Sequence, residues 1–589
     1  MNKIQSDLKG ADFNKKLVWR TNEGFDVQPF YRSEDLGLQL RVRGKLKNNN
    51  CWLVRQDIEV TDYAEANSKA LNVLTNGIDS LGFIIADPAS VSYDNFRMLF
   101  KDIHIEAIEL NFLCNGMAKE ILSHISSVVD ERGLDPSGIH GAIEADPLGR
   151  LMVNGKLCIP PEAGFDYLAS LTRAALALPK MRTVHLKASV FGNAGADIVQ
   201  ELAFALSMGN EYMAQLTDRG LSPADAASKI RFSFSIGSDY FFEIAKLRAA
   251  RALWSVVLKA YIGESAVPEM KLHCITSRWN KTVYDPYVNM LRTQTEAMSA
   301  VIGGTDSLTV EPFDTAYKSP DHFSERIARN QQLILKEEAG FDKVADPSAG
   351  SYYIEKITDM LADSAWKIYL EIEEQGGFLE GLRAGKIQKM ISCSALRKKN
   401  DVATRKTILL GSNQYPMAKD RIPANADINK MFSRKNGDDD VESAVPFRGS
   451  EEYEKIRMAV ETSGWQPAVF LFSIGNPQLR KARSQFSSVF FGCAGYRVID
   501  NNGFDSVDAG VDAAISSKAD IVVICSSDEE YAIYAPEIFK NLKNRSIVVI
   551  AGNPACAYQL RSAGIGNFIH MKSDVPETLR YYNIKLGIN

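Results

Sequence analysis

The sequence predicts an α/β protein with two parallel-sheet domains: a (β/α)8 TIM barrel followed by a flavodoxin-like, doubly wound domain. The first observation is a series of eight short apolar runs, most of them separated by about 25 to 45 residues. Gaps of that length hold a crossover helix, which favours parallel pairing over hairpins. The second is a polar, charged stretch after residue 396, beyond which a shorter strand–helix alternation resumes.

Eight candidate strands make up the predicted barrel. They are Gly82–Ala86, Ala107–Phe112, Ile139–Ile143, Thr183–Lys187, Arg231–Phe234, Lys271–Ile275, Ser307–Val310 and Asp342–Val344. Helices are predicted over 241–261, 321–338 and 353–374, the first with its apolar residues in one arc and Arg251 as the one charged exception. Eight strand–helix alternations are typical of a (β/α)8 barrel.

Five further strands predict the second domain. They are Ala468–Phe472, Arg497–Ile499, Ile521–Cys525, Ile547–Ala551 and Phe568–His570. The run Ile-Val-Val-Ile-Cys is apolar on both faces, as a strand inside a parallel sheet requires. We therefore divide the chain into an amino-terminal arm (1–61), the barrel (62–396), a linker (397–465) and the second domain (466–589).

Composition excludes several classes of protein. The chain of 589 residues carries 68 basic and 73 acidic side chains, so no basic surface for nucleic acid is expected. The amino terminus lacks the apolar core of a signal peptide, and no run approaches the roughly 18 apolar residues of a membrane span. Eight scattered cysteines without a CxxC pair indicate free, mostly buried thiols, so we predict a cytoplasmic protein without a membrane partner.

Four segments resemble the methylmalonyl-CoA mutase family. They read FFEIAKLRAARALW (241–254), DPYVNMLRTQTEAMSAVIGG (285–304), FSERIARNQQLILKEEAGFDKVADPSAGSYYIE (323–355) and DVATRKTILLG (401–411). Residues 17–31 also resemble the amino-terminal arm of that family. The resemblance implies a barrel that binds acyl-CoA along its axis and a second domain that holds cobalamin. Adenosylcobalamin would supply the radical for interconverting methylmalonyl-CoA and succinyl-CoA.

The family's cobalt-binding motif is altered in the second domain. The family places D-x-H-x-x-G after the domain's first strand, where the imidazole ligates cobalt. Here Gln478 replaces the aspartate, Arg480 the histidine and Arg483 the glycine. A guanidinium has no lone pair for a metal, and the domain's one histidine, His570, lies far along the chain. We therefore predict that this chain binds no cofactor and no metal, and that adenosylcobalamin resides in a partner subunit.

The residues that the resemblance assigns to catalysis are altered as well. Asp57 replaces a tyrosine, Ser189 and Val190 replace a Tyr-His pair, and Ile275 replaces a glutamine. Each change removes a group that would hydrogen-bond the substrate, so no catalytic residue is predicted. His273 remains, either as a remnant substrate contact or, as we favour, as a hydrogen-bonded histidine at the end of a strand.

Other charged residues have simpler interpretations. Glu144 and Asp146 follow a strand where a catalytic pair could lie, but the Asp-Pro step favours a strand-to-loop turn. Glu451, Glu452 and the run Asp438–Asp440 are predicted to be solvated charges of the linker.

These observations favour a non-catalytic small subunit of a heterodimeric, adenosylcobalamin-dependent isomerase of this family. Its partner would be a homologous catalytic large subunit, since two related barrels can share an interface inherited from a homodimer. The amino-terminal arm would wrap that partner. Two alternatives remain open: an autonomous cobalamin-dependent acyl-CoA mutase, and a regulatory module that still binds a CoA ester.

Overall fold

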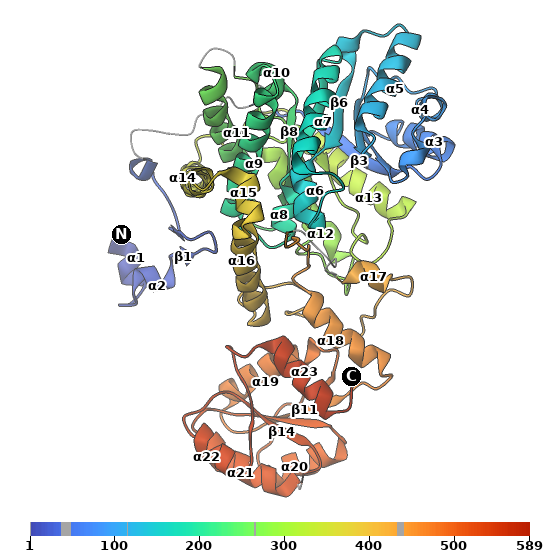
Figure 1. The fold of residues 1–589 in the computed structure, drawn as a ribbon. Coiled ribbons are helices and arrows are strands. Elements are labelled where there is room, and N and C mark those ends of the chain that lie inside the picture. Colours follow the sequence, from blue (N-terminus) through green and yellow to red (C-terminus); the bar gives the residue numbers. More distant parts are fainter. Residues whose placement is uncertain are drawn as a thin grey trace.

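The computed structural model describes residues 2–36, 47, 49–114, 116–263, 267–432, 441–542 and 544–588. It contains a closed barrel of eight parallel strands and a separate five-stranded parallel sheet, together with a short two-stranded hairpin. In Figure 1 the barrel and its helices form the upper body, and the second sheet domain lies below them. The predicted run Asp438–Asp440 lies outside the described residues.

The barrel closes by pairing its first strand with its last. In ring order the strands are β10, β3, β4, β5, β6, β7, β8 and β9. Their bounds are β3 Leu53–Glu59, β4 Ser80–Ile85, β5 Glu109–Cys114, β6 His140–Ala145, β7 Lys180–Lys187, β8 Ile230–Ile236, β9 Leu272–Thr276 and β10 Ser307–Thr309. Seven of these overlap predicted strands, and the closed parallel barrel confirms that part of the predicted fold.

The prediction was wrong at both ends of the strand series. The first strand, β3, was missed because charged residues interrupt the apolar pattern of its sequence, LVRQDIE. The predicted strand Asp342–Val344 is a turn, where the Lys343 amide donates to the Gly340 carbonyl. Since β3 pairs directly with β10, the barrel has no free edge for a further strand.

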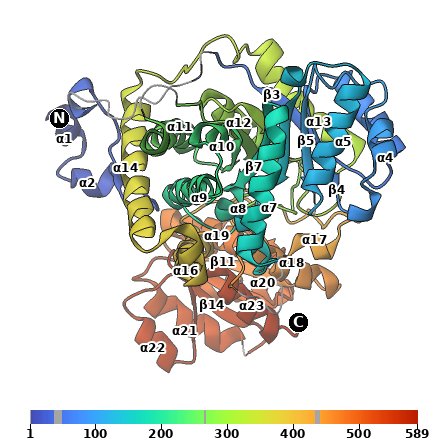
Figure 2. The same ribbon diagram turned by 45° about the horizontal axis from the view of Figure 1, so that its top comes forward.

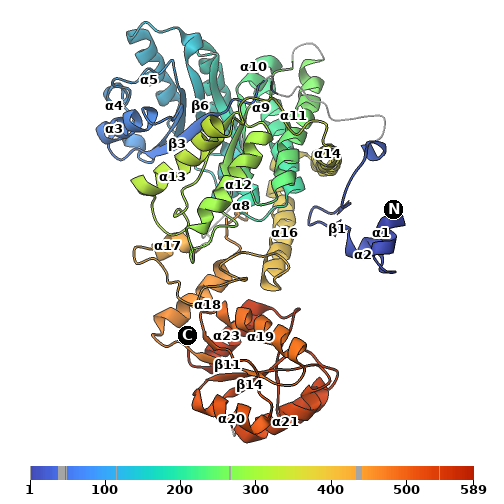
Figure 3. The same ribbon diagram turned by 180° about the vertical axis from the view of Figure 1, so that it is seen from behind.

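Helices cover the outside of the barrel. Those between its strands are α3 Tyr63–Leu74, α4 Tyr93–Leu99, α5 Ala118–Glu131, α6 Pro147–Asn154, α7 Pro161–Ala174, α8 Ser189–Asn193, α9 Ile198–Asp218, α10 Pro223–Ser228, α11 Tyr240–Ile262 and α12 Val288–Ile302. Helix α9 begins at a capping box, in which Asp197 and Gln200 satisfy each other's backbone amides. Helices α12 and α13 (His322–Leu333) lie on the side seen in Figure 3.

Short 3-10 turns and a π-turn complete this region. They are η1 Ser33–Leu36, η2 Pro88–Ser90, η3 Pro136–Gly138, η4 Ala175–Ala177 and the π-turn η5 Ile334–Glu338. Helices α14 Tyr352–Glu374, α15 Gly377–Arg383 and α16 Lys386–Ala403 follow the last barrel strand.

The amino-terminal arm lies against α11 and α14. Its elements are α1 Asn2–Asp7, α2 Phe13–Lys16 and the strands β1 Trp19–Arg20 and β2 Asp26–Val27. Trp19 and Phe25 both pack on the Phe242 ring, with centroids 5.3 and 5.9 Å away. Helices α1 and α2 stand at the edge of the molecule beside α14 (Figure 2), and no described residue of α2 is buried. The arm therefore attaches through its hairpin and leaves its first helices exposed.

The second sheet is covered on both faces. Its strand order is β12, β11, β13, β14, β15. The bounds are β11 Ala468–Ser473, β12 Arg497–Ile499, β13 Ile521–Cys525, β14 Ile547–Ala551 and β15 Asn567–Ile569, with helices α19 Pro477–Gly492, α20 Val507–Ser516, α21 Tyr531–Leu542, α22 Ala557–Ser562 and α23 Val575–Lys585. One apolar cluster lies between the sheet and α18 (Glu451–Thr462), α19 and α23, and another between the sheet and α20, α21 and α22.

The predicted linker contains two helices, α17 Ile428–Met431 and α18 Glu451–Thr462. Arg448 and Glu454 pair at 2.6 Å, and Glu454 also accepts the amide of Val283 from the barrel at 2.8 Å. The prediction of a solvated Glu451 is wrong, because this side chain is buried and accepts the Arg448 amide. Glu452 does pair at the surface, with Arg580. These contacts fix α18 between the barrel and the second domain.

Two further sequence predictions have a structural counterpart. No helix in the described part of the chain is long and apolar enough to cross a membrane. Seven cysteines in that part are free. Three of them (Cys51, Cys158 and Cys393) are exposed, so fewer thiols are buried than the sequence predicted.

Candidate functional site

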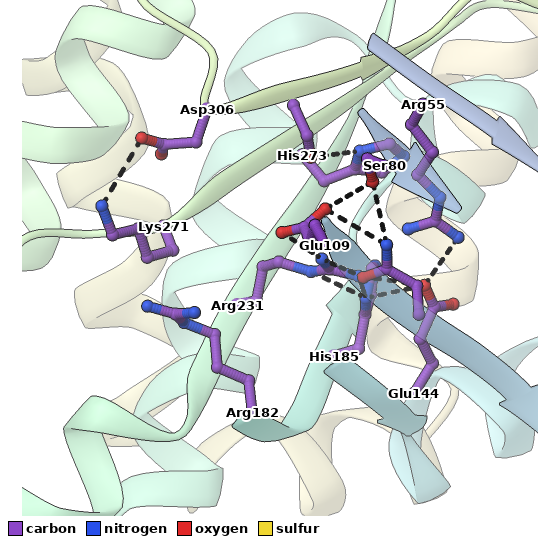
Figure 4. Close-up of polar contacts among 12 residues, drawn as sticks. Arg55, Ser80, Glu109, Glu144, Arg182, His185, Arg231, Lys271, His273 and Asp306 are labelled. Carbon is purple, nitrogen blue, oxygen red and sulfur yellow. Dashed lines mark hydrogen bonds and ion pairs between the residues drawn. The ribbon is translucent and has the colours of Figure 1, made fainter. Parts of the chain in front are cut away.

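Polar and charged side chains fill the inside of the barrel. Barrel interiors are usually packed with branched apolar residues, and buried charges are tolerated only when they are paired. One or more such side chains come from each of the eight strands: Arg55, Ser80, Glu109, Asn111, Glu144, His185, Arg231, His273 and Ser307. Figure 4 shows most of them converging on one another.

Arg231 on β8 contacts four other members of this network. Its guanidinium donates to Asn111 Oδ1 at 2.6 Å, to Glu144 Oε1 at 3.0 Å and to His185 Nδ1 at 2.8 Å. It also forms an ion pair with Glu109 Oε1 at 3.4 Å. Since β8 and β5 are three places apart in the eight-strand ring, the bond to Asn111 crosses the barrel.

Arg55 on β3 makes a second crossing. Its Nη2 lies 2.9 Å from Glu144 Oε1 on β6, three places round the ring, and its Nε lies 2.7 Å from Asp57 Oδ1. A Cβ atom at Gly82 on β4 would overlap Asp57 and crowd Arg55. The glycine therefore provides the space in which this pair lies.

The ionisation of the network follows from its contacts. Burial opposes ionisation of Glu144, but its contact with His185 and the cations Arg55 and Lys187 outweigh burial and hold the pKa of the carboxyl well below its usual range. Burial, together with the cations nearby, lowers the pKa of His185 to about 3. The same causes hold the pKa of His273 well below its usual value. At neutral pH the arginines and glutamates are therefore charged, whereas both imidazoles are neutral.

The network blocks the barrel axis. Two guanidinium groups reach from one wall towards the opposite one, and each ends on a buried carboxylate or amide (Figure 4). A ligand threaded along the axis would have to break the contacts that Arg55 and Arg231 make across the barrel, and would leave Glu144 without its two arginine partners. The cost of separating one such buried ion pair is about 3 to 5 kcal/mol.

The altered barrel positions lie around this network. Asp57 pairs with Arg55 on β3, and Ile275 lies on β9. Ser189 and Val190 begin helix α8, directly after β7. His273 is the second residue of β9, not at the strand's end as expected, and its Nδ1 lies 2.9 Å from Ser307 Oγ. The structure thus gives His273 a hydrogen-bond partner within the barrel.

Sequence reasoning missed the network itself. Arg231 and His185 were assigned to strands without a role, and Glu144 was considered only together with Asp146. Asp146 does mark a turn, since its Oδ1 accepts the Gly149 amide at the start of α6. One sequence pattern could have indicated this network: several otherwise apolar strands each contain a single charged residue. Charged residues are almost never buried in a strand unless they pair with one another.

The second domain is closed at the edge where its strands end. Arg480, at the cobalt-ligand position, donates to the carbonyls of Gly475 (3.4 Å) and Asn502 (3.2 Å), which belong to the loops after β11 and β12. A Cβ atom at Gly503 would lie 2.5 Å from the Arg480 guanidinium carbon, so the side chain is tightly packed. Arg483 pairs with Asp528 in the loop after β13 at 2.9 Å.

Glu530 joins two of these loops. Its carboxylate accepts the Asn476 amide after β11, at 3.1 and 3.2 Å, and the hydroxyls of Ser526 and Ser527 after β13. Burial opposes its ionisation, but the Asn476 amide and the serine hydroxyls lower the pKa of Glu530 to about 2. In doubly wound sheets ligands bind in the crevice at this edge. In this chain the contacts of Arg480, Arg483 and Glu530 join the loops on either side of that crevice.

The residues at this edge do not fit cobalamin. Gln478, Arg480 and Arg483 all lie on α19. The two guanidinium groups have no lone pair for a metal, and Gln478 offers only an amide oxygen in place of an imidazole nitrogen. His570 directly follows β15, at the far edge of the sheet from β12. Within the described part of the chain no group of three or more metal-binding side chains was found.

Fold and site together define a class: an α/β protein that joins a closed parallel barrel to a second parallel sheet, with both potential ligand sites occupied by its own side chains. The family model of methylmalonyl-CoA mutase matches residues 89–462. The chain belongs to the methylmalonyl-CoA mutase family, a family of cobalamin-dependent isomerases.

The relatives are of two kinds. A methylmalonyl-CoA mutase small subunit from Porphyromonas gingivalis is 48% identical over 616 residues, covering 100% of this chain and 97% of that protein. A small subunit from Streptomyces virginiae is 29% identical, covering 92% of this chain and 88% of that protein. A methylmalonyl-CoA mutase from Rhizobium meliloti is 35% identical, covering 68% of this chain and 61% of that protein.

Proposed function

We propose that this chain is the non-catalytic small subunit of a heterodimeric methylmalonyl-CoA mutase. Its role would be to support a homologous catalytic large subunit. The observation that carries the proposal is the ion network across the barrel axis, because Arg55 and Arg231 occupy the path that an acyl-CoA would follow in this family. Similarity over nearly the full length of two small subunits supports it.

The second domain is proposed to bind no cofactor, so that adenosylcobalamin is held by the partner. Its strand order, with the second strand outside the first, is that of flavodoxin-like sheets. The proposed division of the chain into arm, barrel, linker and second domain keeps the boundary 465/466. The arm ends before β3, because that strand belongs to the closed barrel, and the linker begins after α16, because that helix runs past residue 397. His273 would act as a remnant substrate contact only if a ligand entered the inside of the barrel.

Binding to the partner is proposed to involve the amino-terminal arm. Helices α1 and α2 stand away from the barrel, and Leu17, Trp19 and Phe30 are exposed large apolar residues of the arm. These side chains offer apolar area that contact with another chain would bury. We also propose a cytoplasmic location, which the absence of cysteine pairs in the described part supports.

Cofactor binding is the first test. The purified full chain would be incubated with adenosylcobalamin and desalted, and the retained corrin absorbance measured. We expect none from the chain alone and about one equivalent once the catalytic large subunit is added. Stoichiometric colour in the chain alone would contradict the proposal and favour an autonomous mutase.

Assembly is the second test. The full chain and a variant lacking residues 1–35 would each be mixed with the large subunit and analysed by size-exclusion chromatography with light scattering. We expect a one-to-one heterodimer from the full chain and weaker association from the variant. Equal association of both would exclude the arm from the interface, and no heterodimer with the full chain would refute the subunit assignment.

A further inference from the structure

A cavity of about 530 Å³ lies between the amino-terminal arm and the carboxyl ends of β7, β8 and β9. The arm hairpin (19–27) forms one wall, and the start of α11 and the end of α16 form two others. The volume falls in the range of small-molecule sites. The cavity is therefore large enough for a ligand that would touch the arm and the barrel at the same time.

Three of the five carboxylates that line the cavity already have cationic partners in the protein. Glu201 and Glu243 both pair with the buried Lys246, at 2.8 and 2.6 Å. Asp401 pairs with Lys406 at 3.3 Å. The charge of these three is therefore satisfied within the chain.

The other two carboxylates, Glu23 and Asp239, have no such partner. Glu23 belongs to the arm hairpin, and Asp239 directly precedes α11. Neither forms an ion pair with any residue in the described part of the chain. The nearby cation is Lys398, but its ammonium donates to the Ala196 carbonyl at 2.7 Å. Two carboxylates of the cavity thus remain available to a cationic ligand.

Asp239 also departs from the usual role of its position. An aspartate directly before a helix normally accepts a backbone amide of the first turn, which contributes about 1 kcal/mol. The Asp239 side chain makes no such bond to α11 and lines the cavity instead. A residue that breaks a local rule without a structural gain is typical of a functional site.

The surroundings of Glu23 are short of positive charge. Burial is the largest cause of its altered ionisation, and the charges of Asp239 and Asp197 add to burial, so the pKa of Glu23 rises to about 7. Burial raises the pKa of Asp239 as well. Arg397 pairs with Asp197 at 3.4 Å, and Arg20 is exposed on the hairpin. A cation bound between Glu23 and Asp239 would relieve this repulsion.

The walls of the cavity favour an organic cation over a metal ion. No group of three or more metal-binding side chains occurs among the described residues. Trp19, Ile198 and Trp279 add apolar surface to the cavity, which a hydrocarbon chain would cover. The Trp279 ring already has the Lys398 ammonium 5.6 Å from its centroid, and aromatic faces attract such cations. Carboxylates beside apolar and aromatic walls match an aliphatic ammonium ion.

We propose that this cavity binds a primary aliphatic amine, with its ammonium between Glu23 and Asp239 and its hydrocarbon chain along Trp19 and Ile198. An ammonium carries three donors, so it can contact both carboxylates at once. Because one carboxylate lies on the arm and the other on the barrel, the bound amine would hold the arm hairpin in place. The site is independent of the subunit assignment, since it requires no partner chain.

Calorimetric titration of the full chain at pH 8 tests the proposal. The probe is n-butylamine, its neutral analogue n-butanol is the first control, and Mg²⁺ at equal ionic strength controls for charge screening. We expect n-butylamine to bind once per chain and both controls to bind much more weakly. No binding of n-butylamine, or equal affinity for either control, would overturn the proposal.

Three variants locate the site. Glu23→Gln and Asp239→Asn should each weaken n-butylamine binding about tenfold or more, the usual effect of losing a charge-assisted hydrogen bond. Asp512→Asn is the matched control, since Asp512 is exposed on α20 and does not line the cavity. Thermal melting checks the fold of each variant. Unchanged affinity in both cavity variants would refute the site, and if one of them fails to fold the other decides.

The pH dependence of binding tests the role of Glu23 separately. A proton competes with the ammonium for the same carboxylate, whereas the amine itself stays protonated from pH 6 to 8. Affinity should therefore rise over that range, and Glu23→Gln should remove the rise. An affinity that does not change with pH in the unaltered chain would exclude Glu23 from the site.

Hydrogen exchange tests whether the amine holds the arm. Exchange over residues 19–27 at pH 8 should become slower when n-butylamine is bound, and an unchanged rate would refute the contact with the hairpin. Because all these measurements use the chain by itself, their failure leaves the heterodimer proposal intact, and failure to assemble leaves this proposal intact.

Discussion

Replacing Arg231 with methionine tests whether the barrel axis is held closed by buried ion pairs. Methionine has similar length and no charge, so Arg231→Met removes the interactions while filling much of the space. The substitution leaves Asn111 Oδ1 without its 2.6 Å donor and removes one cation from Glu144 and Glu109. Removing one partner of a buried pair costs about 3 to 5 kcal/mol of unfolding free energy.

Arg219→Met is the matched control. Arg219 also has two carboxylate partners, Glu162 and Asp166, both at 2.7 Å, but the side chains of both are 70% exposed. Exposed pairs contribute at most about 1 kcal/mol. The two variants therefore remove equal numbers of ion pairs and differ mainly in burial.

The assay is urea unfolding followed by tryptophan fluorescence, to which Trp52 and Trp254, both buried in the barrel, contribute. We expect Arg231→Met to lower the free energy of unfolding by several kcal/mol and Arg219→Met by less than about 1 kcal/mol. Equal, small losses in both variants would show that the network is not what stabilises the closed barrel. A change in the denaturant slope would instead indicate a second transition.

Three further predictions follow from local contacts. Burial and two neighbouring aspartates raise the pKa of Glu23 to about 7, so the packed arm should lose stability as the pH rises from 4.5 through 7. Hydrogen exchange over residues 19–27 should therefore be faster at pH 8 than at pH 6 after correction for intrinsic rates. The variant Glu23→Gln should remove that difference. Glu454→Ala leaves Arg448 buried without the carboxylate that pairs with it, and should speed proteolysis of the linker; unchanged cleavage would show that α18 is anchored by other contacts. Gly82→Ala should lower the melting temperature by several degrees because its Cβ would overlap Asp57, and an unchanged melt would mean that the Arg55 pair can shift.

Acid should weaken the barrel in two stages. His185 has a folded pKa of about 3 against an ordinary value of 6.5, so its folded state binds fewer protons and stability falls as the pH drops below 6.5. The pKa of Glu109 and that of Glu144 are lowered by folding, so their contribution is fully present above about 4.5 and is lost at lower pH. Unfolding midpoints measured from pH 7 to 3 should decline over both ranges, and a midpoint that is flat from pH 6.5 to 5 would exclude the imidazole contribution.

The strands that could be predicted from the sequence are those whose apolar residues pack against the covering helices. Strands such as β13, apolar on both faces, were found with their exact bounds. Strand β3 was missed because Arg55 and Asp57 interrupt its pattern, and the partner that makes Arg55 tolerable, Glu144, lies about 90 residues away. Local patterning cannot reveal a charge that is satisfied only in the closed barrel.

The same reasoning explains what was predicted of the site. The loss of the cobalt ligand at Arg480 could be predicted from the sequence, because a guanidinium lacks a lone pair for a metal whatever residues surround it. Closure of the axis was not visible, because it depends on which strands face each other across the ring. The buried Glu451 was mistaken for a solvated charge for a similar reason: its acceptor role depends on a loop geometry that brings the Arg448 amide to it.

The pairing of β3 with β10 also has a consequence for how the chain folds. Ser307 lies opposite Leu53, about 250 residues earlier in the chain. Such long-range contacts carry a large loop-closure entropy and make folding slow. During synthesis β3 emerges long before β10, the strand that pairs with its open edge, and Arg55 emerges before Glu144, its partner on β6. An incomplete barrel therefore exposes an open strand edge, a state that chaperones recognise and that invites premature pairing with another nascent chain.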